Sequence, residues 1–190
     1  GFYRRGSHDL VPIEDYLIQD PMIDSTIIAV RDQLRKYHIQ PYDEQTGRGC
    51  IRTVMVRCGY YSHEIMVVLV TNTKKLPHAA DITAALVEQV PGLKTVVQNI
   101  NDQKTNRLLG TKDHTLFGPG TIQDRLLGIK FTISPLSFYQ VNPQQTERLY
   151  QTAIANAGLD GSQTVIDAYC GIGTISLAVA QHAKKVYGVE

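Results

Sequence analysis

The stretch from residue 164 to residue 174, TVIDAYCGIGT, constrains the fold of this chain more than any other. A short β-prone run ends at Asp167, and a turn containing Gly171 and Gly173 leads into a run with the apolar spacing of a helix. Glycine lets the backbone approach a ligand closely and adopt dihedral angles that a side chain forbids. A second β-prone run ends at Glu190, roughly 20 residues after the first carboxylate, where nucleotide-binding α/β units place an acceptor for ribose hydroxyls. The pattern therefore predicts a nucleoside-containing cofactor at the carboxyl end of a parallel sheet.

The spacing of the glycines bears on which cofactor the turn holds. A dinucleotide-binding fingerprint requires G-x-G-x-x-G, but residues 171–176 read GIGTIS and lack the third glycine. A turn with fewer glycines favours S-adenosylmethionine, which has no pyrophosphate to bind at a helix N-terminus. Two glycines after a strand also occur in tight turns without a ligand, so that alternative stays open for this stretch alone.

Composition argues against several classes of protein. The 190-residue chain is 43% hydrophobic and 19% charged, as in an ordinary globular domain. Its three cysteines have no paired spacing, which argues against a disulfide framework and favours a reducing, cytoplasmic location. No apolar run approaches the roughly 18 residues of a membrane span, so no membrane partner is expected. With a net charge of +1, any surface for RNA would have to be a local patch.

The first 133 residues read as a β-rich region with helices. A hairpin is expected at residues 1–5 and 10–13, and Asp20-Pro21 supplies a helix cap and a proline at the first helical position. The polar segment 101–120 is expected to be a loop or hairpin that could meet RNA phosphates, although its composition favours a solvated connector. The other expected elements are helices at 22–37 and 79–90 and strands at 51–57, 65–71, 93–100, 121–123 and 130–133, the last two around a turn at 124–128.

Near Ser134 the β-rich pattern gives way to an α/β alternation, so we expect a domain boundary between residues 133 and 134. Asn142-Pro143 can cap and start a helix, which leaves Gln140 just ahead of a helix N-terminus. An amide there could hydrogen-bond a polar cofactor group; a turn glutamine bonded to backbone is the alternative. A doubly wound sheet needs more strands than this region supplies, so the chain is expected to be a piece of a longer protein. The expected elements are helices at 144–157 and 174–182 and strands at 164–167 and 186–190.

Two motifs in this order resemble a known family. Residues 133–143, ISPLSFYQVNP, precede DAYCGIGT at 167–174, and together they resemble the RNA uracil-5-methyltransferases, which methylate C5 of uridine with S-adenosylmethionine. The resemblance extends to most of the chain, and the opening residues, GFYRRGSH, favour the 23S ribosomal RNA branch found in Gram-positive bacteria. The resemblance implies an α+β, β-rich central domain at 1–133 that faces RNA. It also implies that residues 134–190 begin an α/β, class I, Rossmann-like methyltransferase domain, truncated after its second strand.

The resemblance further implies that seven residues bind the cofactor. They would hydrogen-bond its polar groups, lie beside it, orient the turn or allow close backbone approach. They are Gln140, Tyr169 (ring beside the cofactor), Glu190 (acceptor for the ribose), Asp167 (orienting the turn), Gly171 and Gly173 (close approach), and Thr174, which stands where some relatives have asparagine.

The chemistry of this family explains which groups are missing. Uracil C5 is a weak carbon nucleophile, so these enzymes add a cysteine thiolate to C6 and later remove the C5 proton with a base. In the family both groups lie downstream of the second strand, which here means beyond Glu190. Cys170 is a poor candidate because it lies inside the cofactor turn, and a small buried cysteine is usually a packing residue. The chain alone is expected to lack catalytic residues and to be inactive.

Several members of the family carry a four-cysteine iron–sulfur cluster. One of its ligands would fall near Tyr16, and tyrosine is not a usual cluster ligand. The remaining candidates, Cys50 and Cys58, do not have ligand spacing. We expect neither an iron–sulfur cluster nor another metal site in this chain.

The expected partner is RNA, with 23S ribosomal RNA as the first choice. The target uridine must be unpaired or flipped out, because a thiolate cannot reach C6 inside a stacked helix. Transfer-RNA uracil methylation shares these motifs and stays open, as does a non-catalytic RNA-binding module on the same fold. Nothing in the sequence specifies the target uridine or the oligomeric state. The basic residues expected to contact RNA are Arg48, Arg52, Arg57, Lys104, Arg107 and Lys112.

Overall fold

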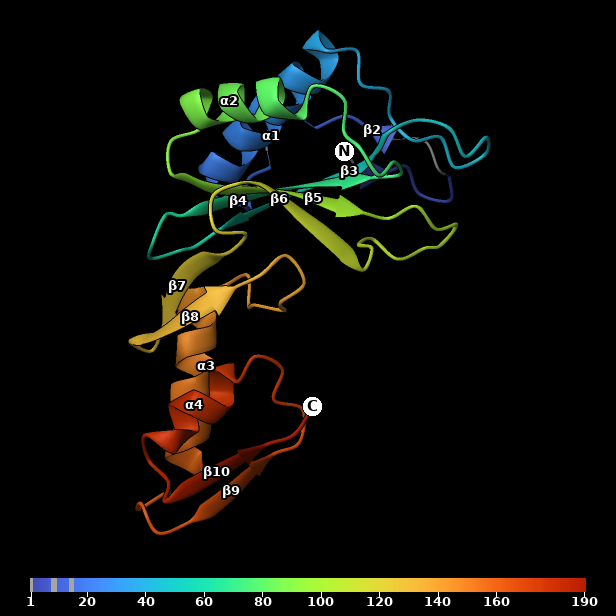
Figure 1. The fold of residues 1–190 in the computed structure, drawn as a ribbon. Coiled ribbons are helices and arrows are strands. Elements are labelled where there is room, and N and C mark those ends of the chain that lie inside the picture. The colour runs from blue at the N-terminus through green and yellow to red at the C-terminus, as the bar shows by residue number, and fades with distance from the viewer. Residues whose placement is uncertain (1, 8–9, 14–15) are drawn as a thin grey trace. The chain divides into compact units, whose positions relative to one another are not determined.

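The computed structural model describes residues 2–7, 10–13 and 16–190, drawn as a ribbon in Figure 1. The chain forms two compact units. The N-terminal unit comprises Gly1–Cys58 and His63–Ile122, and the C-terminal unit comprises Gly59–Ser62 and Gln123–Glu190. The short piece Gly59–Ser62 lies in the turn of a β-hairpin whose two strands belong to the N-terminal unit.

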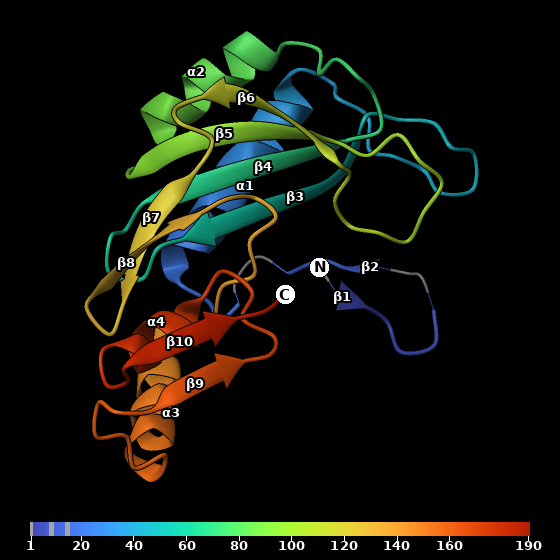
Figure 2. The ribbon, with the colours of Figure 1, turned by 60° about the horizontal axis from the view of Figure 1, so that its bottom comes forward.

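A sheet with strand order β3-β4-β5-β6 forms the centre of the N-terminal unit (Figure 2). Strand β4 (Ile65–Thr71) is antiparallel to β3 (Ile51–Cys58) and parallel to β5 (Leu93–Ile100). Strand β6 (Lys112–Phe117) pairs antiparallel with β5 at the sheet edge. Every residue of β4, IMVVLVT, is buried, as expected of a β-branched run in the interior of a sheet.

Helices α1 (Pro21–Lys36) and α2 (Ala79–Gln89) lie over one face of this sheet (Figure 1). Asp20 caps α1, as predicted, by accepting a backbone hydrogen bond from the first turn at 2.8 Å. Both helices share one hydrophobic core with the strands, and its fully buried members include Val30, Ile82 and Val67. Alternate residues of β4, namely Ile65, Val67 and Leu69, belong to this core. The apolar residues of α1 recur with helical spacing because one face of the helix packs against it.

The expected opening hairpin is confirmed in its central pairs. Strand β1 (Phe2–Tyr3) pairs antiparallel with β2 (Leu10–Val11), whereas Gly1, His8 and Asp9 lie outside the described residues. Of the alternatives for residues 101–120, a hairpin agrees with the structure, because residues 112–117 form β6 and pair antiparallel with β5, whereas a loop or connector throughout the segment is wrong. An edge strand can carry polar, exposed side chains, so the sequence KDHTLF lacks the apolar alternation of an inner strand.

The C-terminal unit contains the predicted α/β alternation. Strands β9 and β10 pair in parallel, and a small core buries Leu126, Phe131, Tyr150 and Ala178. Asn142 caps the helix after the predicted boundary, as expected, by accepting a backbone hydrogen bond at 3.1 Å. The elements are β7 (Ile122–Leu126), β8 (Ile129–Ile133), α3 (Pro143–Asn156), β9 (Thr164–Asp167), α4 (Thr174–Ala180) and β10 (Lys185–Gly188).

Asp124 was expected in a turn at residues 124–128, and this prediction is wrong. Strand β7 continues to Leu126, so only Leu127 and Gly128 separate it from β8. Asp124 is 1% exposed. Its buried carboxylate is satisfied by backbone hydrogen bonds from the turn at residues 60–62, at 2.9, 2.9 and 3.2 Å. A buried acid with partners of this kind is compatible with a strand.

The division into compact units falls at the start of β7, whereas the predicted domain boundary at residues 133 and 134 follows β8. The assignment of separate roles to residues 1–133 and 134–190 stays a prediction. The fold is a mixed α/β fold in which the parallel pair β9–β10 forms part of the C-terminal unit. Within the described part of the chain, no helix has the length and apolar character needed to cross a membrane.

Candidate cofactor-binding site

The carboxyl ends of β9 and β10 lie side by side because the two strands run in the same direction (Figure 2). The Val189 N–H donates to the Asp167 carbonyl at 2.9 Å, and the Cys170 N–H donates to the Val189 carbonyl at 3.0 Å. These bonds join the residues that follow the two strands into one local structure. They lie at the edge of the sheet where open α/β folds bind ligands.

Two glycines give the turn after β9 its shape. Gly171 and Gly173 have φ angles of 54° and 84°, in the left-handed region that side chains disfavour. The Gly173 N–H donates to the Cys170 carbonyl at 2.8 Å, and the Gly173 carbonyl accepts from the Leu177 N–H at 2.9 Å to begin α4. A β-carbon at Gly171 would meet no atom within 4 Å, so this side of the turn is open.

Glu190 reaches back to this turn from the end of β10. Its Oε2 accepts a hydrogen bond from the Gly171 N–H at 2.7 Å. Hydrogen bonds to an ionised acceptor are stronger than neutral ones, so the carboxylate is held in a defined orientation. The structure thus brings together two residues that the sequence assigned to the same cofactor.

Asp167 is hydrogen-bonded on both sides of the turn. The Ser176 hydroxyl of α4 donates to its Oδ2 at 2.5 Å, and the Tyr169 N–H lies 3.4 Å from its Oδ1. The sequence reasoning missed Ser176. Its position could have revealed it, because Ser176 is the third residue of α4 and side chains there point back toward the helix start.

The other turn residues differ in what they contact. Tyr169 is 91% exposed, so its ring is accessible to a ligand. The Thr174 hydroxyl lies 2.8 Å from the Tyr150 hydroxyl and so ties α4 to α3. Cys170 packs against Gly188 of β10, where a β-carbon would lie 2.9 Å from the cysteine sulfur. A side chain at position 188 would therefore require the Cys170 side chain to move.

Gln140 lies in the segment before α3, two residues ahead of the Asn142 cap, and is partly buried. Among the described residues, no hydrogen bond joins it to the other six predicted cofactor contacts, which all lie in or next to the glycine turn. Its neighbour Tyr139 donates to the Arg125 carbonyl at 3.3 Å, and burial raises the pKa of the Tyr139 hydroxyl. A cofactor contact by Gln140 therefore rests on the resemblance alone.

Among the basic residues predicted to meet RNA, Arg52 bonds to the protein's own backbone. Its Nη1 donates to the carbonyls of Asn101 and Gln103 at 3.0 and 2.7 Å, and its Nη2 donates to the Thr105 carbonyl at 3.1 Å. Arg57 is partly buried, and this burial lowers the pKa of its guanidinium. The exposed members of the set are Arg48, Lys104, Arg107 and Lys112.

No group of three or more His, Cys, Asp or Glu side chains is placed to hold a metal ion in the described part of the chain. Among the described residues, the cysteines Cys50, Cys58 and Cys170 form no disulfide bond. Cys50 is buried, its sulfur lies 3.1 Å from the Thr73 hydroxyl, and burial raises its pKa. The expectation of no metal or iron–sulfur cluster stays a prediction.

Known proteins similar to this chain are bacterial RNA methyltransferases by name. Over all 190 residues it is 62% identical to a Lactiplantibacillus plantarum protein and 48% identical to an Enterococcus faecalis protein, each named an uncharacterized RNA methyltransferase. The chain spans 42% of the length of each of these relatives. No protein-family model matches the chain.

The fold is also found in a solved structure, the Pyrococcus abyssi tRNA (uracil-54, C5)-methyltransferase in complex with S-adenosyl-L-homocysteine. The similarity has a TM-score of 0.80 and covers 98% of this chain and 44% of that one. At 21% sequence identity it establishes the fold and nothing more. The predicted mixed α/β fold, with a parallel pair of strands in the C-terminal unit, is confirmed.

Proposed function

We propose that this chain is part of an enzyme that transfers a methyl group from S-adenosylmethionine to C5 of a uridine in RNA. Relatives that align with the whole of this chain are named RNA methyltransferases, which supports RNA methylation. The solved structure with the same fold is that of a uracil-C5 methyltransferase, which supports the finer assignment. Because the chain spans 42% of these relatives, the activity is proposed for the whole protein.

The observation that carries the proposal is the hydrogen bond from Gly171 to Glu190 at 2.7 Å. It holds a carboxylate beside a glycine turn at the ends of two parallel strands, where a nucleoside ribose would bind. Ribose hydroxyls are donors, and an ionised carboxylate is a pure acceptor with two oxygens. This pairing of groups supports a nucleoside cofactor over a purely structural turn.

The turn suits S-adenosylmethionine better than a dinucleotide. Residues 167–174, DAYCGIGT, contain no Lys or Arg, so the turn supplies no cationic side chain for a pyrophosphate. The exposed ring of Tyr169 is available to lie beside the cofactor, and the open side of Gly171 allows it to approach the backbone. Glu190 would accept from the ribose, and Asp167 would keep the turn in shape. When bound, the cofactor supplies an electrophilic methyl group.

We assign the target to 23S ribosomal RNA because residues 1–8 resemble the ribosomal branch of the family. Transfer RNA is the second candidate, and it is favoured by the substrate named for the solved structure of the same fold. In either RNA the target uridine must be unpaired or flipped out to expose C5 and C6. A cytoplasmic location belongs to the same proposal and is supported by the three cysteines, which form no disulfide bond in the described part of the chain.

The nucleophilic cysteine and the catalytic base are proposed to lie outside these 190 residues. Cys170 is unsuited to attack uracil because its sulfur packs against Gly188 inside the turn proposed for the cofactor. The chain alone would then hold part of a cofactor site and none of the groups that activate the base. Isolated, it is expected to be inactive.

The test uses the full-length protein, S-adenosylmethionine and RNA labelled with tritium at uracil C5. Methylation replaces the hydrogen at C5, so tritium released into water reports the reaction directly. Release from 23S ribosomal RNA alone would support both the reaction and the target. Release from transfer RNA alone would keep the reaction and replace the target. If both RNAs bind and neither releases tritium, the assignment as an enzyme would be overturned, and a non-catalytic RNA-binding module would be left.

A further inference from the structure

The connection between β5 and β6 lines a pocket within the N-terminal unit. This β5–β6 pocket has a volume of about 430 Å³ and is lined by residues of the connection together with Lys74. Its volume lies within the usual range for small-ligand pockets, roughly 300–1,000 Å³. It is larger than one phosphate group needs and is sufficient for a phosphate with its sugar.

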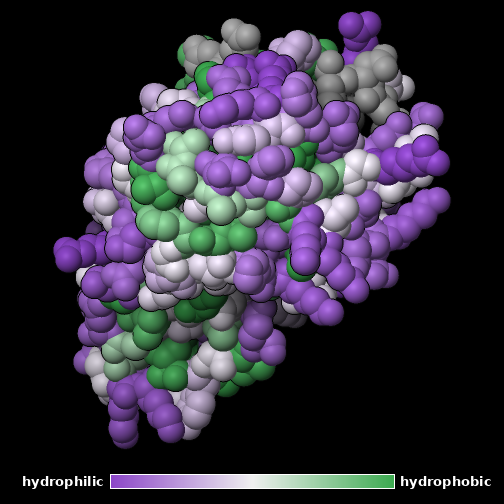
Figure 3. All heavy atoms as spheres, turned by 45° about the horizontal axis from the view of Figure 1, so that its top comes forward, coloured by the Kyte–Doolittle hydropathy of each residue, from purple (hydrophilic) through white to green (hydrophobic). Residues whose placement is uncertain are grey.

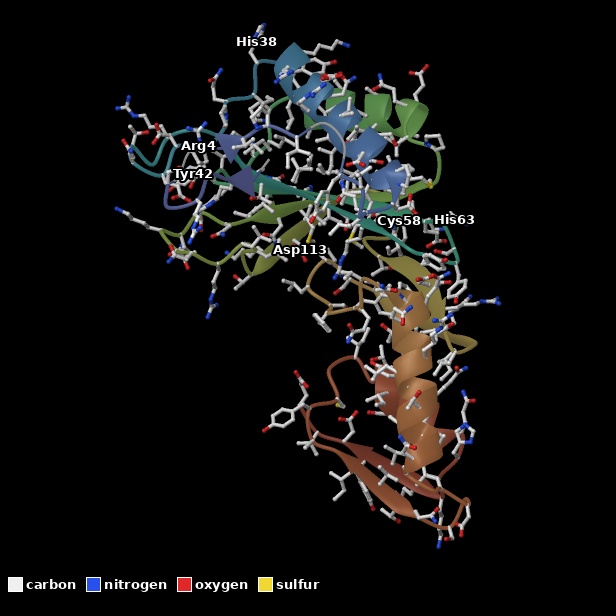
Figure 4. The ribbon with its side chains drawn as sticks, turned by 180° about the vertical axis from the view of Figure 1, so that it is seen from behind. Arg4, His38, Tyr42, Cys58, His63 and Asp113 are labelled. Atoms are coloured by element: carbon white, nitrogen blue, oxygen red, sulfur yellow. The ribbon has the colours of Figure 1, made fainter. Side chains whose placement is uncertain are left out.

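Arg52 of β3 holds the first half of the connection in place. Its hydrogen bonds to the carbonyls of Asn101, Gln103 and Thr105 bridge three alternate residues of the segment. The guanidinium also lies over the ring of Tyr42, 4.4 Å from its centre (Tyr42 is labelled in Figure 4). A planar guanidinium with bonds of this kind is a rigid support, so the segment is ordered by the body of the unit.

Buried amides hold the rest of the pocket wall. Asn99 is fully buried and bonds to Gly110 in both directions, accepting from its N–H at 2.6 Å and donating to its carbonyl at 3.2 Å. Its amide also donates at 2.6 Å to Asp113, which is labelled in Figure 4. Asn101, 2% exposed, donates to the Arg107 carbonyl at 2.8 Å.

Gln98 supports the wall that carries Lys74. It is 2% exposed, and its amide donates to the Lys74 carbonyl at 3.4 Å and to the Thr73 carbonyl at 3.2 Å. Gly110 fixes the closing end, because a β-carbon there would lie 1.8 Å from the Ile100 carbonyl oxygen. The pocket is therefore shaped before any ligand arrives, which lowers the entropic cost of binding.

The charge of the pocket is positive. Lys74, Arg107 and Lys112 line it, against Asp102 as the acidic member. Within the described residues none of these three cations forms an ion pair. Hydrophilic side chains cover the right-hand side of the N-terminal unit in Figure 3, where the loops beyond the sheet lie in Figure 1. A held loop with three unpaired cations is the pattern of a site for phosphate groups.

No aromatic side chain lines the pocket within the described part of the chain. Single-stranded RNA bases are bound chiefly by stacking on aromatic rings, which this pocket cannot provide. The chemistry present is cations, backbone groups and amides, which bind phosphate and sugar. Such contacts position an RNA and carry no sequence information.

We propose that the β5–β6 pocket binds the sugar–phosphate backbone of the RNA substrate through Lys74, Arg107 and Lys112. The proposal rests on the proposed function, since it takes RNA as the partner. It assigns the pocket a sequence-independent role in affinity, through residues other than those proposed to contact the cofactor.

The test compares two full-length variants that lose the same charge. The pocket variant carries Lys74→Gln, Arg107→Gln and Lys112→Gln. The control carries Arg35→Gln, Lys36→Gln and Lys130→Gln, three exposed cations on α1 and β8 that do not line the pocket. Binding to 23S ribosomal RNA and to transfer RNA is measured from 50 to 300 mM salt, and S-adenosylmethionine binding is measured alongside.

The logarithm of affinity falls as the logarithm of the salt concentration rises, and each phosphate contact to single-stranded RNA adds roughly 0.7 to the steepness of that fall. We expect the negative slope of the pocket variant to be shallower by about 2. The control should keep the slope of the unchanged protein, and both variants should bind S-adenosylmethionine as it does. Equal slopes for the two variants, with RNA still bound by the unchanged protein, would overturn the pocket proposal and leave the proposed function standing. A different outcome is that the pocket variant alone loses binding of uridine 5′-monophosphate while its RNA binding is intact. That result would assign the pocket to a free nucleotide and overturn its assignment to the RNA backbone. No RNA binding by the unchanged protein would overturn the proposed function itself, and the pocket proposal with it.

Discussion

The Ser176 hydroxyl donates a 2.5 Å hydrogen bond to Asp167, the residue that ends β9. The bond joins the first turn of α4 to the strand before the glycine turn. The Tyr169 N–H lies 3.4 Å from the other oxygen of the same carboxylate. Asp167 therefore braces the turn from inside, and Ser176 is a positioning residue for the proposed cofactor site.

Replacing Ser176 with Ala removes the hydroxyl that donates to the Asp167 carboxylate. A hydrogen bond to a charged group contributes about 1.5–3 kcal/mol, so the affinity of the full-length protein for S-adenosylmethionine should fall about 10-fold or more. Ser176→Thr keeps the hydroxyl and should recover most of the loss. Isothermal titration calorimetry measures the affinity, and Ser25→Ala on the exposed side of α1 is the control. An unchanged affinity in Ser176→Ala would contradict the positioning role.

Replacing Glu190 with Gln keeps the shape of the side chain and an acceptor for Gly171, but removes the negative charge. The ribose hydroxyls would then face a neutral acceptor, so the dissociation constant for S-adenosylmethionine should rise by about 10-fold. Glu88→Gln, at an exposed position on α2, should leave it unchanged. Equal affinities of the two variants would remove Glu190 from the cofactor site.

Asp124 should contribute to stability through the turn that it caps. Replacing it with Ala would remove the charged acceptor of three backbone hydrogen bonds, from Tyr60, Tyr61 and Ser62, at a cost of about 3 kcal/mol. Asp124→Asn keeps one carbonyl oxygen and should cost less. Urea unfolding of the full-length protein measures the difference, with the exposed Asp32→Ala as control. Coincident midpoints for Asp124→Ala and the control would show that the capped turn adds nothing.

Burial raises the pKa of the Cys50 thiol, and the Thr73 hydroxyl only partly opposes the shift. As pH rises, the unfolded chain therefore loses this proton first, so Cys50 disfavours the folded state above the ordinary thiol pKa of about 8.5. In the folded protein we expect iodoacetamide at pH 8 to modify the partly exposed Cys170 and to leave Cys50 intact until urea is added. Peptide mass spectrometry follows each site. Equally fast modification of both in the folded state would contradict the burial of Cys50.

Periodicity was sufficient to locate the elements whose residues face an apolar core. The run IMVVLVT of β4 and the capped helix after Asp20 follow from hydrophobic pattern and local capping. The pattern did not reveal β6, because a strand at a sheet edge can keep polar, exposed side chains. It did not reveal the buried position of Asp124, because that depends on the turn at residues 60–62, distant in sequence. The candidate site divides in the same way. The glycine turn and Glu190 follow from the motif, whereas Ser176 and the internal bonds of Arg52 required the folded chain.

Arg52→Lys separates the shape of the β5–β6 pocket from its charge. Lysine keeps the positive charge but cannot reproduce the fork of bonds to the carbonyls of Asn101, Gln103 and Thr105. We expect faster amide hydrogen exchange in residues 101–111 and a several-fold loss of RNA affinity, with S-adenosylmethionine binding unchanged. Arg35→Lys, at an exposed position on α1, should change none of these measurements. Faster exchange with full RNA affinity would show that the pocket does not need its preformed shape. Because both variants keep the net charge, any difference between them in RNA affinity measures the contribution of the ordered loop.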